Sequence, residues 1–251
     1  MVNALEYFKE VSMRASKVAR DELPNVKIAA AMIVDCIMHE GIIQAFGTGH
    51  SEAIAGEIAR RAGGLVPTNK ICLRDIVLFG GESATTLFEG PIKLERNPAI
   101  SQRLYDLAAP GQKDVFVLIS NSGINGAVVE MALIAKAQGH KIITILSKEH
   151  AHSEESRHPS KARLSELSDV VLDNGAPIGD AILSMANDET VCAVSTITGA
   201  LLAQMMVAEA IGIMEEKGAT PPIWLSANVA SGDQHNSRMD LKYAGRIRRT
   251  A

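Results

Sequence analysis

Two short loops carry the side chains best suited to hold an anion. The first is Gly47-Thr48-Gly49-His50-Ser51, and the second is Ser120-Asn121-Ser122-Gly123-Ile124-Asn125. Each loop follows an apolar run typical of a strand and precedes a pattern typical of a helix. Hydroxyl and backbone N–H groups at the start of a helix attract negative charge, which the helix dipole also favours. The two loops together therefore predict one phosphate-sized pocket.

A purely structural interpretation of these residues is also open. Ser51 and Asn125 would cap the two helices, while Ser120 and Ser122 would only turn the chain. For a single serine this is the simpler interpretation. Two such loops in equivalent positions favour an anion site instead.

The loops differ from two well-known phosphate motifs. A Gly-x-Gly-x-x-Gly dinucleotide fingerprint starting at Gly47 would need glycine at position 52, where the chain has Glu52, and Asp75 is only a weak match for its acidic residue. The Gly-Lys-Ser/Thr sequence of a nucleoside-triphosphate loop is absent. We therefore expect a small phosphate cradle and no organic cofactor.

The apolar pattern predicts the elements that position these loops. Strands are expected at 41–46, 115–119, 141–146 and 169–172, with a weaker one within 65–73. Strands that are apolar on both faces and alternate with helices predict a three-layer αβα sandwich of the α/β class. Its five-stranded, parallel, doubly wound sheet would have the order 2-1-3-4-5. Both loops would then face the crevice at the switch point between strands 1 and 3.

The whole chain, 1–251, is predicted to form a single domain. Extra N-terminal helices occupy 1–40, the αβα core 41–216, and a C-terminal extension 217–251. A long buried helix is expected over about 189–216, and a polar loop over 148–166.

Composition excludes several classes of protein. The chain has 251 residues, 47% hydrophobic and 22% charged, with a net charge of −4, which argues against a nucleic-acid-binding surface. The basic run 246–249 is interpreted as a solvated tail. Three widely spaced cysteines fit a reduced cytoplasm without disulfides. No signal peptide is recognised, and polar residues interrupt 197–214, so we expect a cytoplasmic protein with no membrane partner.

Several of these segments resemble sugar isomerase (SIS) domains. Residues 47–51 look like the first loop of that family, and residues 117–123, followed by 139–145, look like its central motif. Residues 189–196 are similar to its last phosphosugar contact. The resemblance spans roughly 25–215. A further likeness to a little-characterised bacterial branch of phosphosugar isomerases involves three segments, namely 156–160, 226–228 and 232–236.

The resemblance implies an αβα fold that binds a sugar phosphate, often as a homodimer or homotetramer. It assigns the phosphate to the two loops, with Ser195 and Thr196 closing the site. The implied substrate-binding residues are Gly47, Thr48, Gly49, Ser51, Ser120, Asn121, Ser122, Gly123, Asn125, Ser195 and Thr196.

Aldose–ketose isomerisation needs a base that moves a proton between adjacent carbons and groups that open the sugar ring. Glu57 and Glu89 are the candidate bases, His50 could contact a substrate oxygen, and His235 could open the ring. A solvated helix face for Glu57, a plain loop for His50 and a polar surface loop for His235 are the alternatives.

No metal site is expected. The phosphoheptose isomerases that the chain resembles have a histidine near position 57 and a glutamate four residues later, where this chain has Arg61. Their mechanism therefore does not transfer directly. His150, His152 and His158 lie in the polar region without a fixed carboxylate partner and are interpreted as solvated.

The leading hypothesis is a phosphosugar isomerase that works through an enediol. The alternatives are an amino-sugar-phosphate lyase and a non-catalytic phosphosugar sensor. No helix-turn-helix is recognised before the first strand, which disfavours a transcription regulator.

Overall fold

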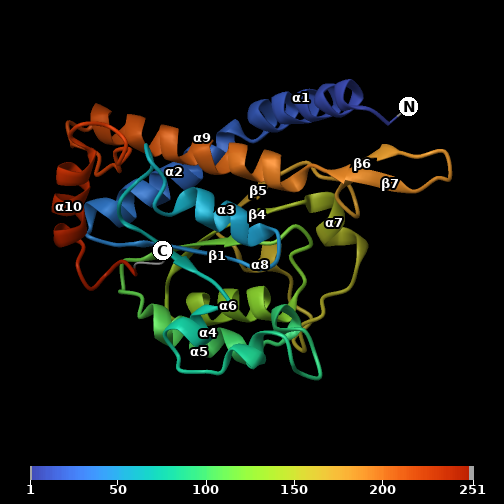
Figure 1. The fold of residues 1–251 in the computed structure, drawn as a ribbon, viewed down its shortest axis with the longest axis horizontal. Helices are drawn as coiled ribbons and strands as arrows, with labels where there is room; N and C mark the ends of the chain where they lie inside the picture. Colours follow the sequence, from blue (N-terminus) through green and yellow to red (C-terminus); the bar gives the residue numbers. More distant parts are fainter. Residues whose placement is uncertain (1, 249–251) are drawn as a thin grey trace.

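A five-stranded parallel sheet forms the centre of the computed structural model, which describes residues 2–248 (Figure 1). The strand order is β2-β1-β3-β4-β5, as predicted. All residues of the central strands β1 and β3 are buried, as a sheet covered on both faces requires. The strands are β1 (Ile43–Gly47), β2 (Thr68–Ile71), β3 (Val115–Ile119), β4 (Lys141–Leu146) and β5 (Val170–Asp173).

Two helical layers cover the sheet and complete the predicted sandwich. One layer contains α1 (Ala4–Asp21), α2 (Leu23–Met38), α3 (Ser51–Ile58) and α9 (Ser195–Glu216). The other contains α4 (Asp75–Leu78), α5 (Ala99–Ala108), α6 (Gly126–Ala137) and α8 (Leu164–Leu167). Each layer shares a separate cluster of buried apolar side chains with its face of the sheet.

Helix α9 is the longest helix of the layer that also contains α1, α2 and α3. Its length and composition would allow it to cross a membrane. However, it packs along α2 and α3 and buries Leu202, Ala203 and Met206 among their side chains. It is therefore a core helix of the sandwich, as the polar interruptions in its sequence predict.

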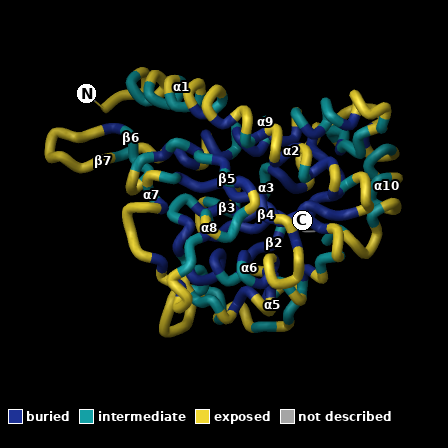
Figure 2. The backbone as a smooth tube through the Cα atoms, turned by 180° about the vertical axis from the view of Figure 1, so that it is seen from behind, coloured by how far each residue is buried: buried dark blue, intermediate teal, exposed yellow. Residues whose placement is uncertain are grey.

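The prediction of helix from residue 189 was wrong. Residues 190–193 form β7 (Thr190–Ala193), which pairs in antiparallel fashion with β6 (Ala181–Ser184). The β-branched residues of β7 favour an extended chain. The carboxylate of Asp180 accepts hydrogen bonds from the backbone N–H groups of Val194 and Ser195. These bonds satisfy free donors where α9 begins. This hairpin lies outside the sandwich and is largely exposed (Figure 2).

Several helix boundaries also differ from the sequence prediction. Ser51 is the first residue of α3 and not its cap, and α3 ends at Ile58. The polar region 148–166 includes α7 (Lys148–Ser153) and α8. Two short 3₁₀ helices, η1 (Ala84–Leu87) and η2 (Leu94–Arg96), lie between α4 and α5. The predicted loop around His235 is part of α10 (Gly232–Lys242).

The interpretation of the basic C-terminal run as a solvated tail was wrong for two of its arginines. Arg246 pairs with the carboxylate of buried Asp114 at 3.0 Å, and Arg248 pairs with that of Asp75 at 2.9 Å. The Arg248 guanidinium also stacks over the Phe79 ring. Arg249 lies outside the described residues. These two ion pairs therefore hold the C-terminal tail against the sheet, at the residue before β3 and at the residues that follow the edge strand β2.

Asp114 is the centre of a buried polar network at the amino-terminal edge of the sheet. Its carboxylate accepts hydrogen bonds from the backbone N–H groups of Ile42 and Gly111 and from the Gln44 amide, all within 2.9 Å. With Arg246, these contacts satisfy both of its oxygens although only 3% of the residue is exposed.

We expect Asp114→Ala to lower the free energy of unfolding by about 3–5 kcal/mol, because buried donors would lose their acceptor. Urea denaturation followed by circular dichroism measures this loss. The matched control is Asp106→Ala, which removes an exposed carboxylate that bonds only Gln102 and should cost about 0.5 kcal/mol or less. A loss below about 1 kcal/mol for Asp114→Ala would contradict the central role of this network.

Candidate functional site

The two serine-bearing loops leave adjacent strands at the same level. In the parallel pairing of β1 with β3, Gly47 lies opposite Ile119. Paired strands are about 4.8 Å apart, so Thr48 and Ser120 begin the two loops side by side. Both residues are buried, which places the floor of the site at the carboxyl edge of the sheet.

Some hydroxyl groups of these loops are available to a ligand. Within residues 2–248, the side chains of Ser51 and Ser122 make no hydrogen bond to protein, and each is partly exposed. The Ser120 hydroxyl accepts from the backbone N–H of Gly123 at 3.1 Å, which leaves its own proton free to donate. A phosphate between the loops would thus meet hydroxyl donors from both.

The first loop depends on glycine at two positions. A Cβ on Gly47 would stand 2.5 Å from the backbone oxygen of Ser51, so no larger residue allows this close turn into α3. Gly49 has a φ of +58°, in the left-handed region that favours glycine.

The N-terminus of α9 lies at the same edge. One turn into this helix, Gly199 approaches Ile54 of α3 and Ile145 of β4 so closely that a Cβ would stand 2.4 Å from the Ile54 side chain. Ser195 is buried there and donates its hydroxyl proton to Asp180 at 2.6 Å, whereas Thr196 is exposed.

A hollow of about 530 Å³ adjoins the first loop. Gly49 and Glu52 line it on one side, and most of the segment 86–95 lines it on the other. The Glu95 carboxylate reaches the loop and lies 3.5 Å from the position that a Cβ on Gly49 would take. Glu89 lines the same hollow.

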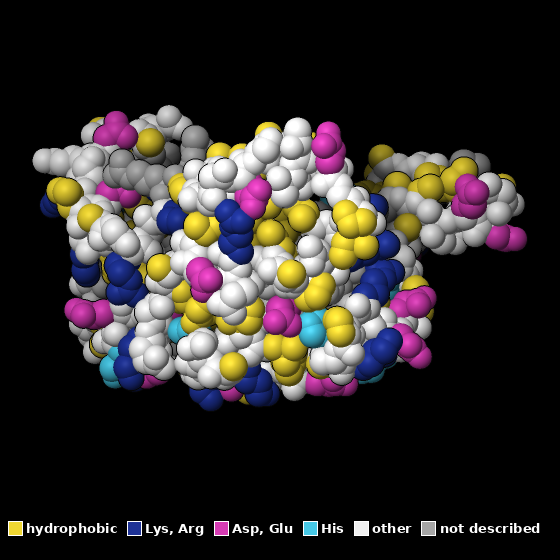
Figure 3. Space-filling model, turned by 90° about the horizontal axis from the view of Figure 1, so that it is seen from below, with side chains coloured by type: hydrophobic (Ala, Val, Ile, Leu, Met, Phe, Trp, Pro, Cys, Tyr) yellow, Lys and Arg dark blue, Asp and Glu magenta, His cyan; other side chains and the backbone are white. Residues whose placement is uncertain are grey.

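The acidic groups of this hollow differ in their partners. Glu52 forms ion pairs with Lys70 and Arg74. The carboxylates of Glu89 and Glu95 make no hydrogen bond or ion pair within the described part of the chain. Exposed apolar side chains surround this region, including Phe88 and Ile92. Figure 3 shows hydrophobic and charged side chains mixed on the lower face of the molecule.

Two of the expected catalytic residues do not face this hollow in the single chain. The Glu57 carboxylate accepts one hydrogen bond from Arg61 and one from Gln204 of α9, both at 2.7 Å. His235 lies on α10, at the opposite edge of the sheet, where its Nε2 bonds the carbonyl oxygen of Ile223. His50 remains exposed in the first loop.

Two histidines interpreted as solvated are in fact held by protein groups. His150 lies 3.3 Å from the Asn121 amide of the second loop, and Asn121 in turn accepts from Asn174. His158 is buried against Glu130. Their spacing in the sequence gave no signal of these contacts, because Asn121 and Glu130 are 29 and 28 residues away from the histidines that they hold.

No cluster of metal-ligating side chains occurs within residues 2–248. Two cysteines are also unsuited to chemistry at neutral pH. Burial raises the pKa of Cys36 to about 12 and that of Cys72, which donates to Asp75, to about 11. Both therefore remain protonated thiols and not thiolate nucleophiles.

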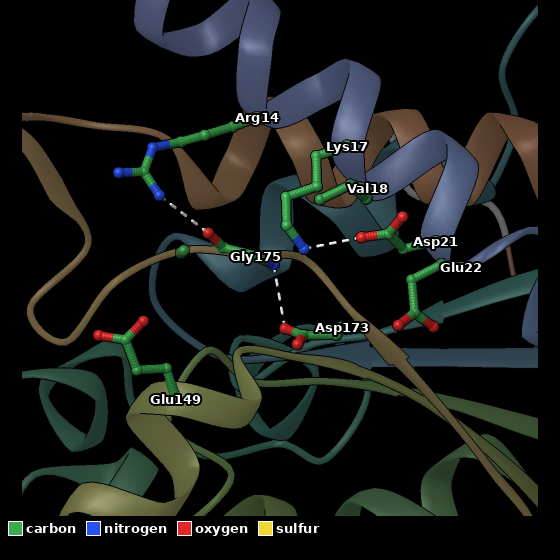
Figure 4. Close-up of a pocket in the computed structure, with 9 residues that line it drawn as sticks. Arg14, Lys17, Val18, Asp21, Glu22, Glu149, Asp173 and Gly175 are labelled. Carbon is green, nitrogen blue, oxygen red and sulfur yellow. Dashed lines mark hydrogen bonds and ion pairs between the residues drawn. The ribbon is translucent and has the colours of Figure 1, made fainter.

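A second hollow of about 250 Å³ lies between α1 and the loop after β5 (Figure 4). Its charged groups are engaged by protein. Lys17 pairs with Asp21 at 2.7 Å, Arg14 donates to the carbonyl oxygen of Gly175, and Asp173 accepts from the N–H of Gly175. Of these contacts, the hydrogen bond from Arg14 to Gly175 attaches α1 to the loop after β5, at the carboxyl edge of the sheet.

Comparison with known proteins identifies the family. The sequence profile of the SIS domain matches residues 6–147. The chain belongs to the SIS domain family. A UPF0309 protein of Geobacillus thermodenitrificans is 38% identical over 96% of this chain and 95% of its own length. Another UPF0309 protein, of Listeria innocua, is 37% identical over 90% of each chain.

Solved structures share the SIS fold seen here. A phosphoheptose isomerase from Francisella tularensis superposes with a TM-score of 0.55 at 16% identity, over 82% of this chain and 94% of its own. A phosphoheptose isomerase from Neisseria gonorrhoeae gives 0.53 at 17% identity, over 83% and 96%. At this identity the likeness concerns the fold alone.

We expect Gly47→Ala to destabilise this SIS protein and to displace the first loop, because the added methyl group meets the backbone of Ser51. Gly56→Ala, in α3, is the matched control: its methyl group meets no atom within 4 Å and should stabilise the helix by about 0.5–1 kcal/mol. Thermal unfolding of both variants measures the difference. Equal melting temperatures would contradict the close turn at Gly47.

Proposed function

We propose that this SIS protein binds a sugar phosphate at the carboxyl edge of β1 and β3 and interconverts its aldose and ketose forms. The observation that carries the proposal is the juxtaposition of the two loops with a carboxylate-lined hollow. The loops supply hydroxyl and N–H donors for the phosphate. The hollow beside Gly49 is large enough for the sugar.

The proposed reaction is an enediol proton transfer. A carboxylate takes the proton from the carbon beside the carbonyl, and the same proton, or one from solvent, returns to the former carbonyl carbon. The proton on the neighbouring hydroxyl moves to the carbonyl oxygen, so the sugar changes isomer without loss of atoms. Hydroxyl and amide groups around the oxygens stabilise the intermediate.

Glu95 is the base that we favour, and Glu89 is the second candidate. Both carboxylates line the hollow without a described protein partner, and Glu95 lies against the first loop. Glu57 and His235 are engaged within the chain. Their proposed roles as base and ring-opening group would need another subunit or a rearranged side chain, and His50 remains a proposed contact to a substrate oxygen.

A homodimer or homotetramer in the cytoplasm fits this proposal. Helix α1 exposes Leu5, Phe8 and Met13, with 78%, 70% and 51% of each residue accessible to solvent. Such apolar side chains on one helix support an interface between copies.

Isotope exchange tests the proposed reaction. The protein is mixed with pentose, hexose and heptose phosphates in deuterated water, and NMR follows deuterium at the carbon beside the carbonyl. Wild type should exchange and interconvert one of these sugars. Glu95→Gln should slow exchange by about 100-fold or more while binding persists. Ser120→Ala/Ser122→Ala should lose binding, and Glu155→Gln, at an exposed site, should match wild type.

Other outcomes favour the alternatives. Binding without exchange in wild type would refute catalysis and support a phosphosugar sensor. Exchange followed by loss of a substituent would support a lyase. No binding of any sugar phosphate would refute the proposed site itself.

A further inference from the structure

The segment Ser156-Arg157-His158-Pro159-Ser160 is fastened to the second serine loop. The backbone N–H of Arg157 donates to the carbonyl oxygen of Ile124 at 3.0 Å, and that of Leu164 donates to Gly123 at 3.0 Å. The first bond holds the segment itself, and the second holds the start of α8, four residues beyond it, against the residues that lead into α6. The segment therefore keeps a constant position relative to the second loop.

Side chains within the segment make it rigid. The buried His158 ring lies between Glu130, whose Oε2 is 2.7 Å from Nε2, and Ser160, whose Oγ is 2.7 Å from Nδ1. The Ser156 hydroxyl donates to the carbonyl oxygen of Ala162 at 2.6 Å. None of these groups faces the candidate hollow, so their effect is to orient the chain at Arg157.

Arg157 presents its guanidinium group at the start of α6. One of its nitrogens, Nη1, donates to the Asn125 side-chain oxygen at 2.8 Å. The side chain is exposed and forms no ion pair with any residue between 2 and 248. By contrast, Arg74 beside the first loop is already paired with Glu52. The other N–H groups of Arg157 are thus free to bind an anion.

Charge is what the two loops themselves lack. Their hydroxyl, amide and N–H groups are neutral, whereas a sugar phosphate carries about −1.5 to −2 at neutral pH. A guanidinium group matches phosphate oxygens with two parallel N–H donors, and such charge-assisted hydrogen bonds are about twice as strong as neutral ones.

We propose that Arg157 is the cationic phosphate ligand of this site, with Asn125 and His158 as positioning residues. The inference rests on the proposed function, because it names a further residue of the same phosphate site. It also gives the segment 156–160 a role, namely to fix one arginine beside the second loop. Phosphate binding should accordingly weaken as ionic strength rises.

Titration calorimetry with inorganic phosphate, and with a sugar phosphate found by the exchange assay, tests this role. Arg157→Gln should raise the Kd for both about 10- to 100-fold, as expected for the loss of a charge-assisted contact. Arg157→Lys should give an intermediate Kd, since it keeps the charge but not the paired donors. The matched control is Lys161→Gln, in the same stretch, which removes an exposed charge and should change the Kd less than twofold.

The outcomes separate the two proposals. If wild type binds phosphate and Arg157→Gln binds it equally well, this inference is refuted and the proposed function stands. If wild type binds neither ligand, both are refuted. Circular dichroism of each variant checks the fold, and a loss of binding in folded Arg157→Gln but not in Lys161→Gln supports the assignment.

Discussion

The parallel pairing of β1 with β3 is the constraint on which the rest of the site depends. Hydrogen bonds between these strands set Gly47 opposite Ile119, and this register places the two serine-bearing loops side by side. A shift of either strand along the other would separate the hydroxyl groups by one or more residues. The buried apolar side chains of both layers hold this register, because they cover the two faces of the central strands.

The two edges of the sheet differ in how their polar side chains are paired with other protein groups. At the amino-terminal edge, the buried Asp114 carboxylate accepts hydrogen bonds from several donors, and the C-terminal tail adds Arg246. At the carboxyl edge, Ser51, Ser122, Glu95 and Arg157 keep polar groups free of partners within residues 2–248. One edge therefore stabilises the fold, while the other keeps the groups that a ligand needs. Polar groups left without protein partners in this way are typical of binding sites.

The sequence allowed the sandwich and its strand order to be predicted, because apolar runs and helix patterns are local signals. It also placed the two loops on neighbouring strands. It failed at residues 190–193, where pairing with β6 decides the structure, and at Arg246, whose partner Asp114 is 132 residues away. Glu95 and Arg157 were missed for the same reason. Their positions beside Gly49 and Asn125 depend on folded contacts that no local spacing encodes.

A crystal structure with a bound sugar phosphate would show whether the two serine-bearing loops hold the phosphate. We expect the phosphorus atom between the loops 47–51 and 120–125, with the hydroxyls of Ser51, Ser120 and Ser122 within hydrogen-bond distance of the phosphate oxygens. The sugar would extend into the hollow beside Gly49. A phosphate bound instead between α1 and the loop after β5, or at the amino-terminal edge of the sheet, would refute the assignment of the phosphate to the two loops.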